Sequence, residues 1–563
     1  MLRKIVQMCL LIAVCCSPAA CAKVKPMVGV YYFPGWYRGG ADKSALPNDK
    51  TAEYSEWRGA ITKGAHPRPL SGFYDDSSPK LWGYFNKWMT SHGIDFIAFD
   101  WYYNDEQEFL QDSLDVGFLG SNPNPKLKFC LHWCNHGGSW WNRKLDQTPP
   151  KLEKMIDLAC DKYFKHPNYL RIDGKPVFMI YETDALSGFG DVKTALTTIR
   201  QQARKHGYSD VHLVGVYSGA SRAEIDRRKG FGYDAFCAYT YAWMRGPSIA
   251  WNSKAFDYKD ITSNVVERVH PYLARIARED GIAYWPTTFS GWDDRPRAGL
   301  EDAIVLQGNT PAEFGRMFRS AIKHVNPASP VVMVEAWNEW GEGACMEPSK
   351  EHGFGYLREI ATAVGASKPD ERVPSAAEIA SWSILSPEEL KTAKENETKP
   401  WPVKPVTYNK LGKSRKVADV KLPVVLDFAA GGIEFDANDI RLDSRDADGL
   451  VVTTTGSDPQ FAVSTPEIPP GQIKRITLEA DITPSPGGKA TSPELYIATA
   501  LLPDYSPFAS FLMPPVKDGA SSFLTSDVMF WDSCGTPLTK IRLDPCGEPG
   551  VKIHLRRLIL SGG

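Results

Sequence analysis

Short apolar runs alternate with amphipathic stretches along the first two thirds of the chain. The runs are hydrophobic at consecutive positions, which is typical of parallel strands covered on both faces. The eight strands predicted in this way are Val28–Phe33, Phe96–Trp101, Lys128–Trp133, Pro176–Tyr181, Val211–Tyr217, Asp234–Tyr239, Ile282–Thr288 and Pro330–Trp337. Helical spacing of apolar residues predicts helices between them, for example over Val192–His206 and Pro311–Val325. This count predicts an α/β fold, a (β/α)8 TIM barrel over residues 27–366.

The pattern changes after the predicted barrel. Residues 367–418 are rich in proline and charge, which predicts a linker, with one helical patch near Pro387–Lys394. Residues 419–563 carry β-branched residues between Gly, Pro and Asp turns, with strands expected over Gly449–Thr454, Arg475–Ile482 and Val551–Leu560. We expect a jelly-roll-like, all-β sandwich there.

Composition narrows the classes of function. Lys and Arg total 65 against 67 for Asp and Glu, so no basic excess supports a nucleic-acid partner. Of 17 tryptophans, 14 lie in the first 340 residues. That excess predicts either a large core or a surface that stacks on a flat ligand. A monomer is expected.

The N-terminus resembles an export signal. Met1–Ala22 has basic residues, then an apolar run, then small residues before a cleavage pattern at Ala20–Ala22. The alternative is lipidation of Cys21, as in a bacterial lipoprotein. The protein is therefore expected in the periplasm, on the cell surface or secreted, with no membrane contact beyond that anchor.

The cysteines support neither a zinc ribbon nor a redox motif, because no C-x-x-C pair occurs. Cys130 with Cys134, and Cys534 with Cys546, could form disulfides, and burial as small hydrophobic residues is the alternative. No metal and no cofactor is expected.

The residues at the ends of the predicted strands are aromatic, acidic, amide or imidazole side chains. Strand ends form the active-site face of a TIM barrel. Aromatic faces stack on sugar rings, and the polar groups bind hydroxyls. The expected sugar-binding residues are Tyr32, Trp36, Asp100, Trp101, His132, Trp133, Asn135, Glu182, Tyr241, Trp292, Asp293, Arg297, Trp337, Asn338 and Trp340.

Glu339 and Glu342 are the expected catalytic pair. They lie three residues apart in a glycine-containing loop, within about 10 Å of each other even when extended. Glycosidic cleavage needs two such carboxyl groups, and this reach fits both retaining and inverting geometries. Exposed loop glutamates are the alternative, and Glu335 and Glu347 are rival acids.

Several strand-end residues have a second interpretation. His132 and His136, with Asp100 or Glu182, suggest a metal site, although a strand end need not turn both imidazoles to one side. Arg297 is expected to bind a carboxylate or hydroxyl, with a surface charge as the alternative. Asp293 could instead hold its loop.

Several motifs resemble one known family. They are Tyr31-Tyr32-Phe33-Pro34-Gly35-Trp36-Tyr37, His166-Pro167-Asn168-Tyr169 before Gly174-Lys175-Pro176, Gly291-Trp292-Asp293 with Pro296-Arg297, and Trp337-Asn338-Glu339-Trp340 with Glu342. Together they resemble the family 99-like glycoside hydrolases, a group that overlaps the WbsX-type glycosyltransferases. The resemblance implies a metal-free, retaining endo-α-mannosidase or endo-α-mannanase. It also implies that Glu339 is the base on the substrate 2-hydroxyl and Glu342 the acid/base on the glycosidic oxygen.

Two other functions stay open, glycosyl transfer and sugar binding without catalysis. The chain lacks a P-loop and a G-x-G-x-x-G segment after a strand, which weakens nucleotide-sugar transfer. The glutamate pair weakens the binding-only alternative. The C-terminal segment resembles sandwich modules of glycoside hydrolases, which bind carbohydrate or brace the barrel; its one tryptophan, Trp531, favours bracing.

Overall fold

The computed structural model covers the barrel, most of the linker and the sandwich. It describes residues 25–37, 56–62, 68–104, 106–135, 148–217, 219, 221–245, 249, 252–397, 399, 402, 404–408, 420–485, 492–499, 505, 510–529, 531 and 536–562. The predicted signal peptide with Cys21, and also His136 and Cys534, lie outside these residues. Among the described residues, no helix has both the length and the apolar character needed to cross a membrane.

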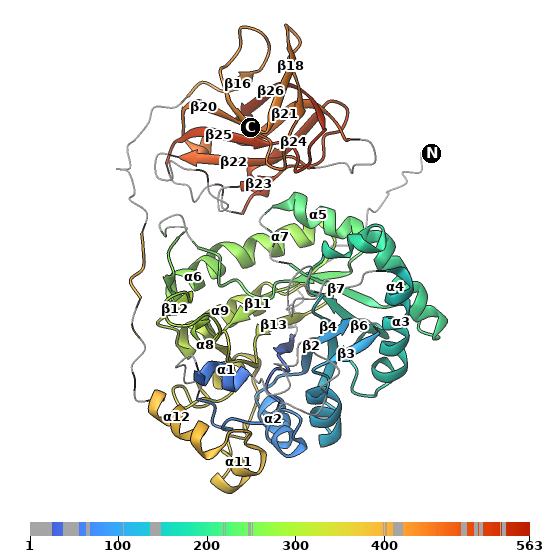
Figure 1. Ribbon diagram of the computed structural model, residues 1–563, viewed down its shortest axis with the longest axis vertical. Helices are drawn as coiled ribbons and strands as arrows, with labels where there is room; N and C mark the ends of the chain where they lie inside the picture. The colour runs from blue at the N-terminus through green and yellow to red at the C-terminus, as the bar shows by residue number, and fades with distance from the viewer. Residues whose placement is uncertain are drawn as a thin grey trace, which may run out of the picture.

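The first domain is a closed parallel barrel, which confirms the predicted fold (Figure 1). Its strands are β1 (Met27–Tyr32), β2 (Phe96–Asn104), β4 (Lys128–Trp133), β6 (Lys175–Ile180), β7 (His212–Val216), β8 (Ala235–Cys237), β10 (Ala283–Trp285) with β11 (Thr287–Phe289), and β13 (Val331–Glu335). β10 pairs with β8 while β11 pairs with β13, which pairs with β1 and closes the ring. Pro286 separates the two halves of that strand because proline has no N–H for the ladder.

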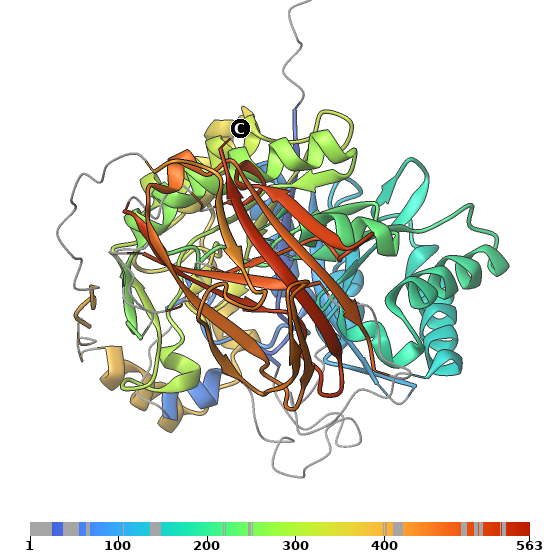
Figure 2. The same cartoon turned by 90° about the horizontal axis from the view of Figure 1, so that it is seen from above.

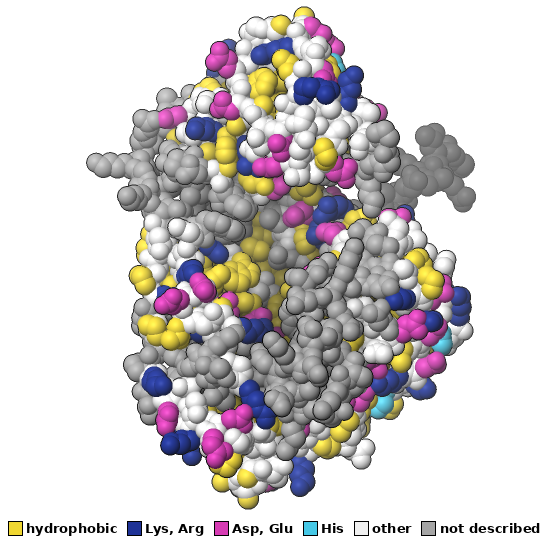
Figure 3. Space-filling view, in the orientation of Figure 1, with side chains coloured by type: hydrophobic (Ala, Val, Ile, Leu, Met, Phe, Trp, Pro, Cys, Tyr) yellow, Lys and Arg dark blue, Asp and Glu magenta, His cyan; other side chains and the backbone are white. Residues whose placement is uncertain are grey.

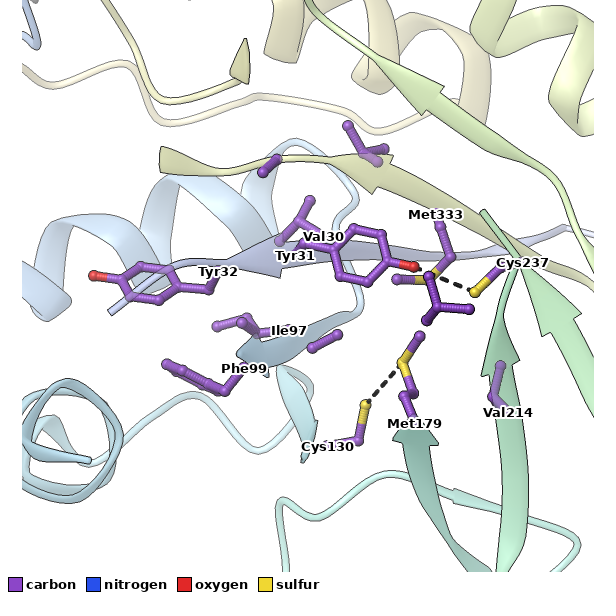
Figure 4. Close-up of a cluster of buried hydrophobic side chains, with 14 of the residues drawn as sticks. Val30, Tyr31, Tyr32, Ile97, Phe99, Cys130, Met179, Val214, Cys237 and Met333 are labelled. Atoms are coloured by element: carbon purple, nitrogen blue, oxygen red, sulfur yellow. Dashed lines mark hydrogen bonds between the residues drawn. The ribbon is translucent and has the colours of Figure 1, made fainter. Parts of the chain in front are cut away.

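Side chains from opposite strands fill the barrel interior (Figure 4). The Tyr31 hydroxyl lies 3.2 Å from the Cys237 sulfur and donates to the Ala238 carbonyl at 3.0 Å. The Cys130 thiol donates to the Met179 sulfur at 3.8 Å. Cys130 and Cys134 are separate buried thiols and form no disulfide with each other. The interior is therefore a packed core, and chemistry is confined to the strand ends.

Helices cover the outside of the barrel. They are α1 (Glu56–Thr62), α2 (Pro79–Ser91), α3 (Pro149–Leu158), α4 (Val192–Lys205), α5 (Arg222–Phe231), α6 (Tyr258–Asn264), α7 (His270–Asp280), α8 (Arg295–Ala298), α9 (Pro311–Lys323) and α10 (Gly355–Val364). Side-chain caps start several of them; the Thr310 hydroxyl, for example, accepts from the Glu313 N–H before α9. The sequence of α5 is polar and has one buried residue, Ile225, so it lacks the apolar spacing that predicts a helix.

The segment after the barrel packs along it. Two helices, α11 (Ala376–Trp382) and α12 (Pro387–Glu397), lie at the end of the molecule opposite the sandwich (Figure 1). The Trp382 indole donates to the Ser71 carbonyl at 2.9 Å. Further on, Tyr408 forms an isolated bridge with Ile249 on the side of the barrel. The expected linker is thus a strap with helices of its own.

The C-terminal segment forms two packed antiparallel sheets, which confirms the predicted sandwich. One sheet contains β16 (Val424–Asp427), β18 (Ile440–Arg445), β19 (Leu450–Thr454), β21 (Arg475–Thr483), β24 (Ala520–Leu524) and β26 (Lys552–Ser561). The other contains β17 (Asp436–Asn438), β20 (Gln460–Ile468), β22 (Glu494–Thr499), β23 (Ser510–Leu512) and β25 (Leu538–Asp544). Trp531 is buried in their core, where its indole donates to the Pro470 carbonyl at 3.0 Å.

The sandwich contacts the barrel at α5 and α7 (Figures 1 and 2). The Tyr272 hydroxyl of α7 donates to the Asp527 carbonyl at 2.6 Å, and the Asp527 carboxylate lies 3.2 Å from Arg222 of α5. Ser221 forms a bridge with Val528, and Met529 packs into the barrel's own core. These contacts tie the sandwich to the outer helices of the barrel.

Candidate active site

The Glu339–Glu342 loop follows the last barrel strand as a tight hairpin. β14 (Asn338–Glu339) pairs antiparallel with β15 (Ala344–Cys345). A Cβ on Gly341 would lie 2.6 Å from Arg297 Nε, and one on Gly343, whose φ is +66°, would lie 2.7 Å from the Asp293 Cβ. Both glycines are therefore required for the loop to approach residues 293–297 this closely.

Arg297 binds both predicted catalytic carboxylates. Its Nη2 donates to Glu339 Oε2 at 2.9 Å, and its Nη1 donates to Glu342 Oε1 at 2.5 Å. The two carboxylates therefore lie side by side on one guanidinium, and Arg297 is a paired, partly buried cation and not a free surface charge. The Glu339 side chain is 4% exposed and that of Glu342 is 18% exposed.

Tyr239 joins this pair to a second acid–base pair. Its hydroxyl donates to Glu339 Oε1 at 3.2 Å, while its ring stacks on His132 at 6.4 Å. His132 Nδ1 and Asp100 Oδ1 are 2.7 Å apart, and both residues are buried. Burial raises the pKa of the Asp100 carboxyl. The structure thus connects Asp100, His132, Tyr239 and Glu339 in one layer at the strand ends.

Tyr239 was missed by the sequence analysis, which selected Tyr241. The Tyr241 hydroxyl is buried and lies 2.8 Å from that of Tyr284, away from the carboxylates. The alternation of side chains along the strand indicates that Tyr239 faces the site. Cys237 points into the barrel, and Tyr239, two residues on, shares its side.

Two further glutamates lie near the pair. Glu335 is fully buried, and neither carboxyl oxygen makes a hydrogen bond of normal geometry with a described residue. Burial, and then the charge of Glu342, raises the pKa of Glu335 well above its usual value. Glu347 accepts from the hydroxyls of Ser71 and Tyr74 and from the Trp340 indole. Burial raises the pKa of Glu347 to about 7.

Most of the tryptophans expected to stack on sugar are packed into the structure. Exposure is at most 7% for five of these six tryptophans, Trp36, Trp101, Trp133, Trp337 and Trp340. Trp36 packs on Trp57 at a centroid distance of 4.2 Å. Tyr32 is also buried, against Trp82 at 4.8 Å. Trp243 and Trp292 are half-buried and meet edge to face at 5.1 Å.

Three predicted polar ligands hold the backbone or a neighbour. The Asn338 amide donates to the Phe33 carbonyl at 2.8 Å and accepts from the Phe33 N–H at 2.9 Å. Asn135 holds the backbone of Glu182 in the same way, at 2.9 and 2.8 Å. Asp293 pairs with Arg295, and its N–H donates to the Glu342 carbonyl at 2.5 Å. These side chains fix the strand ends on which the site stands.

One group of side chains has the composition of a metal site. Asp100, His132 and Cys134 each offer an atom within 4.8 Å of the others. Burial raises the pKa of the Cys134 thiol well above its usual value, and metal ligation needs the thiolate. The hydrogen bond between Asp100 and His132 occupies Nδ1 of His132, so the imidazole would have only Nε2 to offer a metal. The donor set therefore fits a metal poorly.

The fold and the site together define a TIM-barrel protein with a carboxylate pair on one arginine at its strand ends. A family described as glycosyltransferase WbsX matches residues 63–360, and the chain belongs to this family. Two curated relatives, both named uncharacterized protein WxcX from strains of Xanthomonas campestris pv. campestris, are 23% and 24% identical over 334 and 328 residues. The matches cover 54% of this chain and 45% of each relative, so the chain spans about half the length of those relatives.

Solved structures resemble the two domains separately. A GH99 endo-α-mannosidase from Bacteroides thetaiotaomicron is 16% identical with a TM-score of 0.43, covering 60% of this chain and 96% of that one. A glycoside hydrolase-like protein is 18% identical with a TM-score of 0.45, covering 60% and 94%. A family 29 carbohydrate binding module is 12% identical with a TM-score of 0.19, covering 25% and 89%.

Proposed function

We propose that the protein is a retaining glycoside hydrolase acting on a polysaccharide or glycan. The observation that carries this proposal is the binding of Glu339 and Glu342 to the two terminal nitrogens of Arg297. Glycoside hydrolases use two neighbouring carboxyl groups for acid/base cleavage, and the active site of a TIM barrel lies at its strand ends. On the face drawn in Figure 3, acidic and basic side chains are interspersed, which suits an uncharged substrate.

The surroundings of the two glutamates suggest different roles. Glu339 is the more buried and accepts hydrogen bonds from both Arg297 and Tyr239. These donors stabilise its anion, so Glu339 would act as the base that takes the proton of the substrate 2-hydroxyl. The 2-oxygen would then bond to the anomeric carbon as the glycosidic bond breaks, giving an anhydro-sugar.

Glu342 is more exposed and would meet the leaving group. It would give its proton to the glycosidic oxygen in the first step and take a proton from water in the second. Water would add to the anomeric carbon, the 2-oxygen would regain its proton from Glu339, and the anomeric configuration would be retained. Among substrates we place α-mannosides first, on the motif resemblance and because an axial 2-hydroxyl suits this step.

Product analysis tests the proposal. The purified full chain is incubated with yeast mannan, N-glycans and plant polysaccharides, and the first-formed anomer is followed by NMR. We expect an α-linked substrate to give the α-anomer, and Glu342→Gln to lower turnover about 10²–10⁴-fold. Glu359→Gln, which removes a carboxylate beside Arg319 on the outer surface, is the control. Unchanged turnover in Glu342→Gln would refute the mechanism.

Glycosyl transfer is the second candidate because the family's description names it. A transferase would move sugar from a nucleotide donor to an acceptor. The same protein is therefore assayed with UDP- and GDP-sugars in the presence of oligosaccharide acceptors. Product growth with no release of sugar from polysaccharides would favour this candidate.

We also propose that the chain is exported. The support is the pattern of residues 1–22 described above. Mass spectrometry of the mature protein distinguishes the two versions: cleavage after Ala22 gives an N-terminal Lys23, whereas lipidation gives a diacylglyceryl Cys21. An unprocessed Met1 would refute both.

A further inference from the structure

A cavity lies beside the loop that carries Glu339 and Glu342. It has a volume of about 370 Å³ and lies between the loops that follow β11 and β15. The aromatic residues Trp292, Trp340 and Tyr356, together with His352, line it. Arg297, Glu339 and Glu342 are not among its described lining residues. The cavity has the size of a small-ligand site and is separate from the carboxylate pair.

The charges in its wall are paired with each other. Arg295 binds Asp293 at 2.8 Å, and Arg68 binds Glu351. Burial lowers the pKa of His352, which favours the neutral imidazole. The pocket therefore has little net charge, and an anionic or cationic ligand would find no uncompensated partner in it.

The polar groups of the pocket stand next to ring faces. Asn309 donates to the Tyr356 hydroxyl at 3.0 Å, and the His352 ring meets that of Tyr356 edge to face at 5.1 Å. The Trp292 Nε1–H is buried and makes no hydrogen bond to a described residue. A pyranose has an apolar C–H face, which the aromatic rings would contact. It also has a rim of hydroxyls, which the amide and the Trp292 N–H would bind.

The strap after the barrel forms one side of the pocket. The Gln307 amide donates to the Lys404 carbonyl at 2.9 Å and accepts from the Lys404 N–H at 3.0 Å. Arg295 also donates to the Pro402 carbonyl, at 3.2 Å, and Pro402 itself lines the cavity. The pocket is therefore completed by residues that lie outside the barrel's own strands and helices.

The opposite wall is shared with the catalytic loop. Trp292 and Gly343 line the pocket, and Asp293, next to Trp292, bonds to the backbone of Glu342. A ligand in the pocket would thus contact the segment that holds the general acid. The pocket and the carboxylate pair are therefore neighbours on the two sides of one loop.

We propose that this pocket is a second carbohydrate subsite, which holds one neutral pyranose of the glycan without acting on it. The proposal rests on the proposed function for its choice of ligand, but binding in the pocket needs no turnover. Trp292 and His352 would contact the ring, and the paired side chains would bind its hydroxyls.

Calorimetric titration tests the subsite. The full chain carrying Glu339→Gln, which prevents turnover, is titrated with the methyl α-glycosides of mannose, glucose and galactose. Methyl α-glucuronide is the charged comparison. We expect at least one neutral glycoside to bind, His352→Ala with Trp292→Ala to weaken that binding at least tenfold, and the glucuronide to bind at least tenfold more weakly.

His166→Ala is the matched control, because His166 is half-buried at the opposite end of the barrel strands. Binding of no neutral glycoside, or equal binding in the parent and the double variant, would overturn the subsite. A protein that binds these glycosides in the pocket but releases no sugar from any polysaccharide would refute the proposed function and leave the subsite standing.

Discussion

The barrel buries carboxyl groups at its strand ends, whereas the sandwich keeps its charged groups on the surface. In the barrel, Asp100, Glu335, Glu339 and Glu347 are at most 6% exposed. In the sandwich, charged groups pair on the surface, as Arg557 does with Glu479 at 2.6 Å, where their side chains are 50% and 25% exposed. Burying a carboxylate is costly, whereas a surface pair contributes little. The costly arrangement occurs where the chemistry is expected.

The tryptophans follow the same division. The sandwich's single tryptophan is part of the sandwich core. The sandwich contacts the barrel through other residues, such as Asp527. Most of the barrel's strand-end tryptophans are buried among their neighbours, and one of them, Trp340, donates its indole N–H to Glu347. Because most of these rings face other side chains, the acids and Arg297 are the first residues to substitute in a test of the site.

The largest effect is expected for Arg297→Lys. Lysine keeps the charge but loses the fork that holds both glutamates. We expect kcat/KM to fall about 10²–10³-fold, with the loss mainly in kcat, because the carboxylates would lose their common orientation. Arg319→Lys, at an exposed pair with Glu359, is the control. Equal activity in both variants would mean that the fork has no catalytic role.

The second effect is the pH dependence of the unfolding free energy that the titration of Glu347 causes. Its pKa is about 7 in the folded protein, above that of the unfolded chain. The fold therefore favours the protonated acid, and stability is lost as pH rises through about 7. Between pH 5 and 8 we expect this loss to reach about 3 kcal/mol in the unfolding free energy.

Glu347→Gln should remove that pH dependence, so urea unfolding at several pH values compares the variant with the parent. Glu359→Gln supplies the background from a surface carboxylate. A constant difference between parent and Glu347→Gln across this range would show that Glu347 does not titrate in the fold.

Sequence patterns predicted the barrel well because its strands are buried on both faces and therefore apolar throughout. Glu339, Glu342 and Arg297 were selected because glycines and tryptophans mark their loops, and the structure brings their side chains together. The strand-end tryptophans were harder to interpret, because an indole that packs on its neighbour and one that faces a ligand have the same sequence signal. The strap's helix α11 depends on long-range contacts that no local pattern carries. Tyr239 follows the alternation of its strand, but its partner Glu339 lies 100 residues away in the sequence.

A smaller effect separates Tyr239 from Tyr241. Tyr239→Phe removes one donor to Glu339. We expect kcat to fall about tenfold, in line with the loss of a hydrogen bond to a charged group. Tyr241→Phe removes a hydroxyl that bonds only to Tyr284 among the described residues, and it should leave kcat within about twofold. A larger loss in Tyr241→Phe would place that residue in the site after all.

The smallest effects compare the interface with the sandwich surface. Arg222 pairs with Asp280, Glu279 and Asp527 and is only 22% exposed, so Arg222→Ala should cost about 1–2 kcal/mol and lower the Tm. Arg557→Ala removes an exposed pair and should cost less than about 0.5 kcal/mol. Differential scanning calorimetry measures both. If the sandwich braces the barrel, we expect the parent to unfold in one transition, Arg222→Ala to unfold in two, and Arg557→Ala to unfold in one. Equal shifts in the two variants would mean that the interface adds no more stability than any surface pair.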